Sequence, residues 1–394
     1  MAFIVRIIET MKPRCTKKPK VLAAGPGVQD PGRGKQSINH WSSLSDEVVL
    51  FILRFLPQQD LVIISLVNRR FRHLSKDPSL WTKLTLDFEN IKQNVESCRK
   101  LVDRCKKLAS IKITNNSLNC GKLNIMTVVT RAKESLKSLE VDLSMKEWTP
   151  AAMAKLGSLK NLTWLSLSVN SDPKSVNSYI GANMLKELAN LDQLEVLNLA
   201  IRNYHSGYDE SFSMLETVFQ QLKKLKEVKL FPAFYDESLV VALAENNPDL
   251  KVLHGMTYSS LSDRTVDILV NSCPGFEKFI ISSSHSESQI NKLSSSWPNL
   301  KHLGIQPSPP FGSIDLNDEK LIGYVEKFRS LEAIVLCSIY PCVNVTDSGI
   351  ERLVGSAEKL KLLILRAPQV TKDLVKRLRI EYPDLNLRIN ERSY

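Results

Sequence analysis

The sequence contains few cysteines, and their spacing favours neither a metal site nor a disulfide framework. Its 394 residues include seven cysteines, an odd number, and none of them forms a C-x-x-C pair. Zinc modules and disulfide-stabilised secreted domains show regular cysteine spacing. Scattered cysteines are typical of a reducing compartment, so we expect a cytoplasmic or nuclear protein without a structural metal.

Long apolar runs and catalytic signatures are also absent from the sequence. The apolar run Phe3–Ile8 is too short to cross a bilayer, is interrupted by Arg6 and lacks the features of a signal peptide. The six histidines form no H-E-x-x-H motif, and no G-x-S-x-G occurs. We therefore expect no membrane segment, no catalytic residues, no cofactor and no enzymatic activity.

Positive charge is concentrated at the start of the chain. The net charge is +11, and residues 1–40 hold eight basic against two acidic side chains, a net +6. Four prolines and four glycines in the same stretch leave little to pack, which predicts a flexible basic arm over 1–40. Its cluster Lys12–Lys20 is a weak nuclear-import or nucleic-acid signal, and a solvated tail is the favoured interpretation. The remaining +5 does not indicate nucleic-acid binding, and no membrane partner is expected.

The stretch from Trp41 to Trp81 is more apolar than a segment of its size can bury. Two helical faces are apolar in its first half: Val49, Ile52, Leu53 and Leu56 on one, and Val48, Phe51 and Phe55 on the other. Ser45, Pro57 and Asn68 are the boundary signals that divide the stretch into three short helices. Because about 40 residues cannot cover both faces, we expect a partner to cover one of them.

This stretch resembles the F-box. The residues that carry the resemblance are Leu44, Asp46, Glu47, the apolar run to Leu56 and Pro57, Asp60, Leu61, Val67 to Phe71, Leu74 and Asp77 to Trp81. The family usually has proline at the position of Ser45 and often cysteine at the position of Asn68. The resemblance implies docking on the Skp-family linker of SCF ubiquitin ligases, and through it on cullin and RING subunits. An ordinary buried helical hairpin is the alternative.

Seven apolar residues are predicted to supply the linker contact or its immediate support. They are Leu44, Val48, Ile52, Leu56, Leu61, Ile64 and Trp81.

An internal repeat follows this stretch. The pattern apolar-x-x-apolar-x-apolar recurs at intervals of 24 to 32 residues, close to the leucine-rich-repeat period. Its first positions are Trp81, Leu108, Leu136, Leu162, Leu194, Leu225, Leu250, Phe276, Leu300, Leu331, Leu360 and Leu385. A helical segment follows many of these units, and several such segments open with a Ser-Asp or Thr-Asp cap.

The predicted fold class is α/β. A three-helix F-box over 41–84 precedes a curved leucine-rich-repeat solenoid over 85–390, with parallel strands inside and helices outside, and 391–394 form the C-terminal end. Between the inward leucines, alternate strand residues face the inner surface. The predicted substrate-binding residues on that surface are Trp164, Asn198, Phe231, His254 and His302.

The favoured function is that of a non-catalytic substrate receptor of an SCF-type ubiquitin ligase. The F-box would bind the linker, and the repeats would hold a protein target for ubiquitination and proteasomal degradation. The alternative is a leucine-rich-repeat scaffold or interaction protein without ligase function. A nucleic-acid binder acting through the basic arm is the least favoured of the three.

Overall fold

The computed structural model describes residues 41–87, 105–114, 126–144, 149–170, 185–202, 208–234, 237–256, 261–306, 316–336 and 341–390, except 42, 106, 127, 128 and 283. The predicted arm over 1–40 and the end over 391–394 lie outside these residues. The chain forms two compact units. Of the described residues, the first contains 41–84 and 105–108, and the second, the repeat unit, contains the rest. The predicted domain boundaries stay a prediction.

The first unit is built from short helices. They are α2 (Asp46–Leu53), α3 (Gln58–Ile64), α4 (Arg69–Leu74) and the 3-10 turn η1 (Pro78–Leu80). Ser45 occupies the N-cap position of α2 without a side-chain capping bond, whereas Asn68 caps α4 by accepting the Phe71 N–H at 2.8 Å. Pro57 immediately precedes α3.

The core of the first unit is apolar and includes one buried indole. The side chains that fill it are Val49, Leu53, Leu61, Ile64, Phe71, Leu74, Leu80 and Trp81. Trp81 donates its Nε1–H to the Ser75 carbonyl at 2.6 Å, which satisfies the indole inside this core. Arg70 joins the start of α2 to α4 through Asp46 at 2.7 Å and the carbonyls of Trp41 and Leu44.

The described strands form one sheet in which neighbours in sequence are neighbours in space. They are β1 (Lys83–Asp87), β2 (Ser110–Thr114), β3 (Ser138–Ser144), β4 (Trp164–Asn170), β5 (Val196–Arg202), β6 (Glu227–Phe234), β7 (Val252–Met256), β8 (Lys278–Ser282), β9 (His302–Gln306), β10 (Ala333–Leu336), β11 (Leu362–Leu365) and β12 (Asn386–Ile389). Pairing from β2 to β12 is parallel. The predicted α/β solenoid is therefore confirmed.

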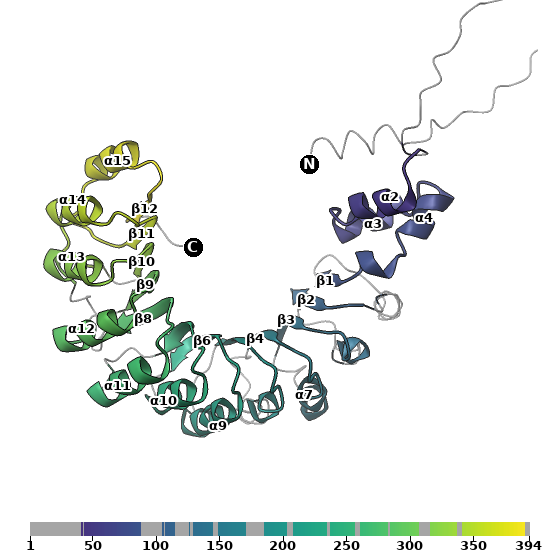
Figure 1. The fold of residues 1–394 in the computed structure, drawn as a ribbon, viewed down its shortest axis with the longest axis horizontal. Coiled ribbons are helices and arrows are strands. Elements are labelled where there is room, and N and C mark those ends of the chain that lie inside the picture. Colours follow the sequence, from purple (N-terminus) through teal and green to yellow (C-terminus); the bar gives the residue numbers. More distant parts are fainter. Residues whose placement is uncertain are drawn as a thin grey trace, which may run out of the picture. The chain divides into compact units, whose positions relative to one another are not determined.

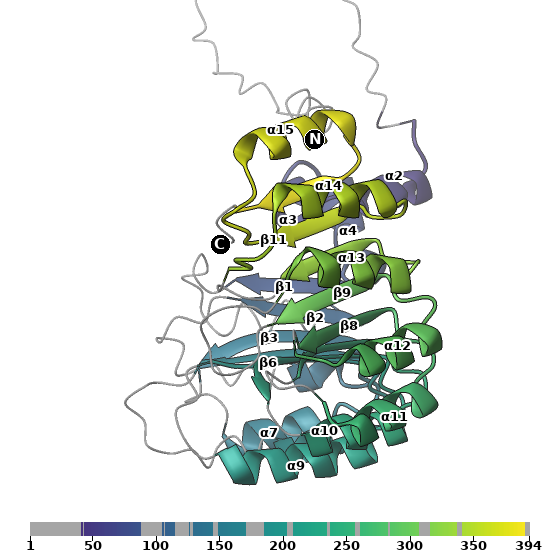
Figure 2. The same cartoon turned by 90° about the vertical axis from the view of Figure 1, so that its left-hand side faces the viewer.

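Within the repeat unit the strands form one layer and the helices form a second layer against one face of the sheet (Figures 1 and 2). The other face of the sheet is the inner face. The helices are the 3-10 turn η2 (Thr130–Ala132), α7 (Pro150–Gly157), α9 (Tyr208–Gln221), α10 (Glu237–Asn246), α11 (Asp263–Ser272), α12 (Glu287–Ser296), α13 (Asp318–Lys327), α14 (Asp347–Ser356) and α15 (Lys372–Glu381). Between the two layers lie the repeated apolar side chains; Leu165, Leu197 and Val228 are fully buried in consecutive strands. Burial of this ladder is what each repeat gains from its neighbours.

Acidic side chains at helix starts bind the cap of the next repeat. Glu237 of α10 accepts the backbone N–H and the hydroxyl of Ser262, the N-cap of α11, at 2.9 and 2.6 Å. Asp318 of α13 does the same for Thr346 at 2.8 and 2.6 Å. Asp347 of α14 repeats it with Thr371 at 2.7 Å for both atoms. These contacts, the cap ladder, fix the spacing between adjacent helices.

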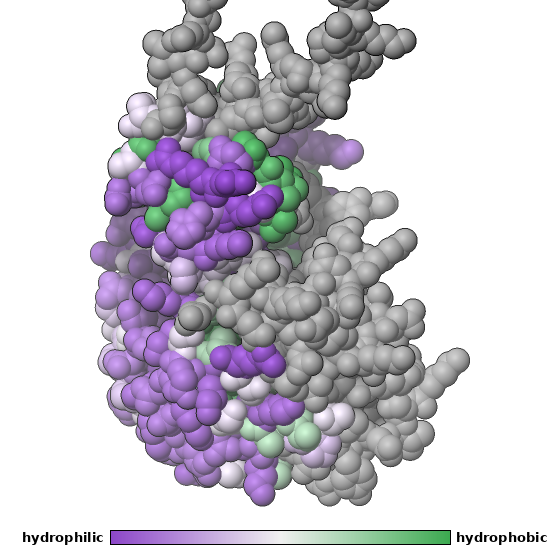
Figure 3. Space-filling model, turned by 90° about the vertical axis from the view of Figure 1, so that its right-hand side faces the viewer, coloured by the Kyte–Doolittle hydropathy of each residue, from purple (hydrophilic) through white to green (hydrophobic). Residues whose placement is uncertain are grey.

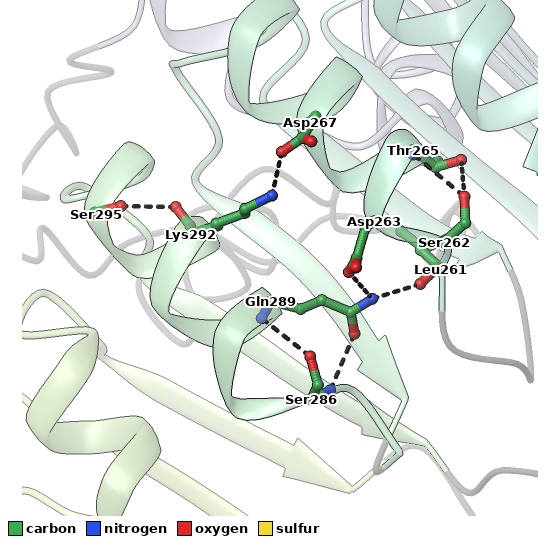
Figure 4. A network of polar contacts seen from close by, with 9 residues as sticks. All are labelled: Leu261, Ser262, Asp263, Thr265, Asp267, Ser286, Gln289, Lys292 and Ser295. Atoms are coloured by element: carbon green, nitrogen blue, oxygen red, sulfur yellow. Dashed lines mark hydrogen bonds and ion pairs between the residues drawn. The ribbon is translucent and has the colours of Figure 1, made fainter.

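Figure 4 shows the variant of this ladder between α11 and α12. Ser286 and Gln289 form a reciprocal capping box at the start of α12. The Gln289 Nε2 group also reaches back to the Leu261 carbonyl at 2.8 Å and to Asp263 Oδ1 at 2.9 Å. Asp263 at the start of α11 is therefore still the acceptor, and the donor is the Gln289 amide instead of the backbone N–H and hydroxyl of a cap residue.

One irregularity interrupts the inner face between β6 and β7. Lys229 pairs with His254, and the register then shifts so that Phe234 pairs with Met256, which leaves three additional residues in β6. Gly255, which lies between the two β7 residues, has φ +88°. Its missing Cβ leaves room for the Leu230 carbonyl oxygen of β6. The sequence repeat lacks its third apolar residue at this glycine.

No described helix is long and apolar enough to cross a membrane.

Candidate docking surfaces

An exposed apolar patch lies on the first unit. Its side chains are between 44% and 72% exposed, and they are Val48, Phe51, Phe55, Val62, Ile63 and Leu66. Within the described residues only Val343 and Ile380 are other large apolar side chains with comparable exposure. Figure 3 shows apolar atoms gathered among polar ones on this part of the surface. We name these six residues the docking patch.

Helical periodicity separates the docking patch from the core. On α2, Val49 and Leu53 face inward, while Val48 and Phe51 face solvent, followed by Phe55 just beyond the helix. The rings of Phe51 and Phe55 meet edge to face with centroids 5.2 Å apart. On α3 the buried residues are Leu61 and Ile64, so the neighbouring Val62 and Ile63 are directed outward.

The seven residues predicted for linker contact divide into two groups. Val48 is exposed, and Leu44, Ile52 and Leu56 are half-buried, so these four are available at the surface. Leu61, Ile64 and Trp81 are 2%, 6% and 7% exposed, which places them in the core beneath the surface. These three can support the surface from below but cannot touch a linker themselves. Their roles toward a linker stay a prediction.

Sequence reasoning left five of the exposed residues out of the predicted contact. They are Phe51, Phe55, Val62, Ile63 and Leu66. The signal for the first two was present, since Val48, Phe51 and Phe55 form an i, i+3, i+7 face. The apolar run of α3 gave no comparable signal, because almost every position in it is apolar.

The predicted substrate-binding residues lie on the inner strands of the repeat unit, in two rows set by the register. Trp164 and His302 belong to a row that also contains Glu227 and Lys278. Asn198 and His254 belong to the adjacent row, in which Asn198 pairs with Lys229 and Lys229 with His254. Phe231 lies in β6 opposite Ala200, and its side chain is outside the described residues.

Parallel pairing brings basic side chains together on β6 to β9. Lys229 pairs with His254, and Lys278 pairs with His302. Burial, followed by the positive charges of Lys229 and Lys278, lowers the pKa of His254. Burial and then Lys278 lower the pKa of His302. We name Lys229, His254, Lys278 and His302 the basic group.

The lysines of the inner face differ in their partners. Lys112 is paired with Glu140 at 2.8 Å, and Lys229 with Glu227 at 2.5 Å. Lys278 forms no ion pair with any described residue and is half-exposed. It is therefore the cation of the basic group whose charge is available to a ligand.

Three buried polar atoms on the inner strands have no hydrogen-bond partner in the described part of the chain. They are Ser168 Oγ, Asn198 Oδ1 and Gln306 Nε2. A buried polar atom without a partner costs about 1–3 kcal/mol, so native proteins keep few of them. Their presence on β4, β5 and β9 marks this face rather than the helical layer as polar and incompletely satisfied.

The described residues contain no cluster of His, Cys, Asp and Glu able to hold a metal ion. The free cysteines among them, Cys105, Cys273 and Cys342, are buried. Burial raises the pKa of the Cys273 and Cys342 thiols to about 12 each, which keeps them protonated and unreactive at neutral pH.

Comparison with known families identifies the first unit. Residues 41–87 match the model of the F-box-like family. The F-box-like segment therefore contains all of the docking patch and all seven residues predicted for linker contact. Proteins of the F-box family are in general non-catalytic adaptors.

Solved structures resemble most of the chain at low sequence identity. A chain in the crystal structure of the Rad7 and Elc1 complex in yeast is 16% identical, with a TM-score of 0.52 over 90% of this chain and 95% of that one. The leucine-rich repeat-containing protein LegL7 from Legionella pneumophila is 14% identical, with a TM-score of 0.41 over 77% of this chain and 98% of that one. The first likeness supports the fold. No curated protein sequence matches this chain.

Proposed function

We propose that the chain is a substrate receptor of an SCF-type ubiquitin ligase, acting in the cytoplasm or nucleus. The F-box-like segment binds a Skp-family linker, which joins it to cullin and RING subunits. The repeat unit holds a protein target so that ubiquitin is transferred by proximity, followed by proteasomal degradation. The similar Rad7–Elc1 structure, itself a complex, is compatible with a chain that works bound to a partner.

The observation that carries the proposal is the docking patch. Monomeric proteins rarely leave aromatic and branched side chains grouped at the surface of so small a unit. Phe51 and Phe55 are 59% and 66% exposed. Both belong to the F-box-like segment, whose family implies a linker that would cover them. Aromatic residues of this kind dominate the binding energy of protein interfaces.

The test replaces Phe51→Ala and Phe55→Ala together in the full-length chain. Because central interface anchors contribute about 2 kcal/mol or more each, linker affinity should fall at least about a hundredfold. The free energy of unfolding should change by less than about 1 kcal/mol, since both rings are more than half exposed in the folded chain. Titration calorimetry with the purified linker and urea unfolding measure the two quantities.

Two further variants make the test specific. Ile380→Ala removes an 84% exposed side chain of α15 and should leave linker affinity unchanged. Leu61→Ala should destabilise the first unit by about 2–5 kcal/mol, because it opens a cavity in the core. Undiminished linker binding by the Phe51, Phe55 double variant would show that the linker contacts another surface than the docking patch. No linker binding by the native chain would favour a leucine-rich-repeat scaffold without ligase function.

A further inference from the structure

The inner face of β6 to β11 combines two kinds of surface. The basic group occupies β6 to β9. An apolar row runs beside it, in which Ile280 and Val335 both pair with Gly304, and Val335 also pairs with Ile364. Ile280, Val335 and Ile364 are half-exposed, unlike the buried residues that alternate with them.

The surroundings of His302 leave its ring accessible. It pairs with Lys278 on one side and with the small Ala333 on the other, and Gly304 follows two positions later on the same face. An imidazole and a lysine ammonium side by side can both donate to one anionic group. Lys278 forms no ion pair within the described residues, so binding of an anionic ligand to its ammonium group does not require an existing ion pair to break.

Acidic side chains limit the width of this positive region. Glu227 pairs with Lys229, Glu277 binds Lys251 and Lys301, and Glu332 binds Lys361. A nucleic acid presents a phosphate at every nucleotide and would bring several of them against these carboxylates. An isolated acidic residue brings a single charge to Lys278 and His302, and the nearby Glu277 and Glu332 are themselves engaged by lysines.

We propose that β6 to β11 bind an extended segment of a target protein, with an acidic or phosphorylated side chain on Lys278 and His302 and an apolar side chain on the Val335–Ile364 part of the row. This proposal deepens the proposed receptor function by naming the chemistry of the target. Neighbouring strands lie about 4.8 Å apart, so β9 and β11 are separated by about 10 Å. An extended peptide covers that distance in about three residues, which sets the spacing between its acidic and apolar positions.

The test presents randomised twelve-residue peptides, with phosphoserine among the building blocks, to the immobilised full-length chain. We expect the retained pool to be enriched in aspartate, glutamate or phosphoserine about three positions from an aliphatic residue. Lys278→Glu should reduce that acidic enrichment at least about tenfold. A second selection in the presence of inorganic phosphate shows whether the retained anionic residue is a carboxylate or a phosphoserine. The control Lys112→Glu reverses a charge on the same face but on β2, and should keep the enrichment.

Several outcomes would overturn the inference. They are absence of acidic enrichment with the native chain, unchanged enrichment with Lys278→Glu, and retention of a single-stranded RNA 20-mer that Lys278→Glu abolishes. Linker affinity is measured on the same variants and should be unaffected by Lys278→Glu. A chain that binds the linker but selects no acidic peptide refutes this inference alone, whereas a chain that fails to bind the linker refutes the proposed receptor function.

Discussion

At the scale of single residues, the inner face depends on which side chains the register places together. His254 has Lys229 and Lys278 among its facing charges, with Glu227 and His302, and its burial disfavours the imidazolium form. His302 faces Lys278, Lys301, Glu277 and Glu332, and burial is again the larger effect. In the absence of a ligand, both rings are kept closer to neutrality than exposed histidines.

These lowered pKa values predict a loss of stability in mild acid. Below about pH 6.5 the histidines of the unfolded chain become protonated, whereas His254 and His302 of the folded chain stay neutral until the pH reaches their lower pKa values. The unfolded state therefore binds more protons, and the folded chain loses stability as the pH falls through this range. The melting temperature of the repeat unit should fall between pH 7.5 and 5.5, and His254→Gln should reduce that fall. His73→Gln, an exposed residue of α4, is the matched control. An equal fall in melting temperature in the native chain, His254→Gln and His73→Gln would show that His254 does not cause the acid sensitivity.

At the scale of the elements, the cap ladder couples each helix to the next. Gly349 shows how closely the contact is packed, since a Cβ at this position would collide with the Asp318 carboxylate that binds Thr346. Gly355 lies on the same helix, α14, with no atom near the place of its missing Cβ. The two glycines therefore form a natural pair for measuring the ladder.

Alanine should have opposite effects at these two positions. Gly355→Ala should raise the free energy of unfolding by about 0.5–1 kcal/mol, the usual helical advantage of alanine. Gly349→Ala should lower it by about 1–2 kcal/mol, because displacing Asp318 breaks charge-assisted hydrogen bonds that exceed this gain. Chemical denaturation followed by circular dichroism compares them. Stabilisation by both alanines would show that the Asp318–Thr346 contact contributes little.

At the scale of the whole molecule, we propose that linker docking and target binding use separate compact units. A chain with Phe51→Ala and Phe55→Ala should therefore lose ubiquitination while its repeats still hold targets. Proximity labelling in cells should show target proteins accumulating on this variant relative to the native chain, and adding Lys278→Glu should release them. If no protein accumulates, the division of roles between the two units is wrong. If accumulated proteins remain bound after Lys278→Glu, the proposed binding site on the inner face is wrong.

The sequence by itself determined the architecture. The spacing of Leu165, Leu197 and Val228, each about one repeat from the next, already placed an apolar ladder inside a parallel sheet, and every one of them is buried. The F-box resemblance located the first unit, and residues 41–87 match that family. Such patterns are readable because burial of a periodic apolar side chain is the largest favourable contribution to folding.

Only the tertiary structure decided which apolar and charged residues are presented to partners. In α3, Leu61 and Val62 are equally apolar in sequence, but the packing of the short helices buries one and exposes the other. Lys278 and His302 are more than twenty residues apart, and the strand register makes them neighbours. Exposure and lateral neighbours depend on how elements pack against one another, and a single chain's local pattern does not encode that packing.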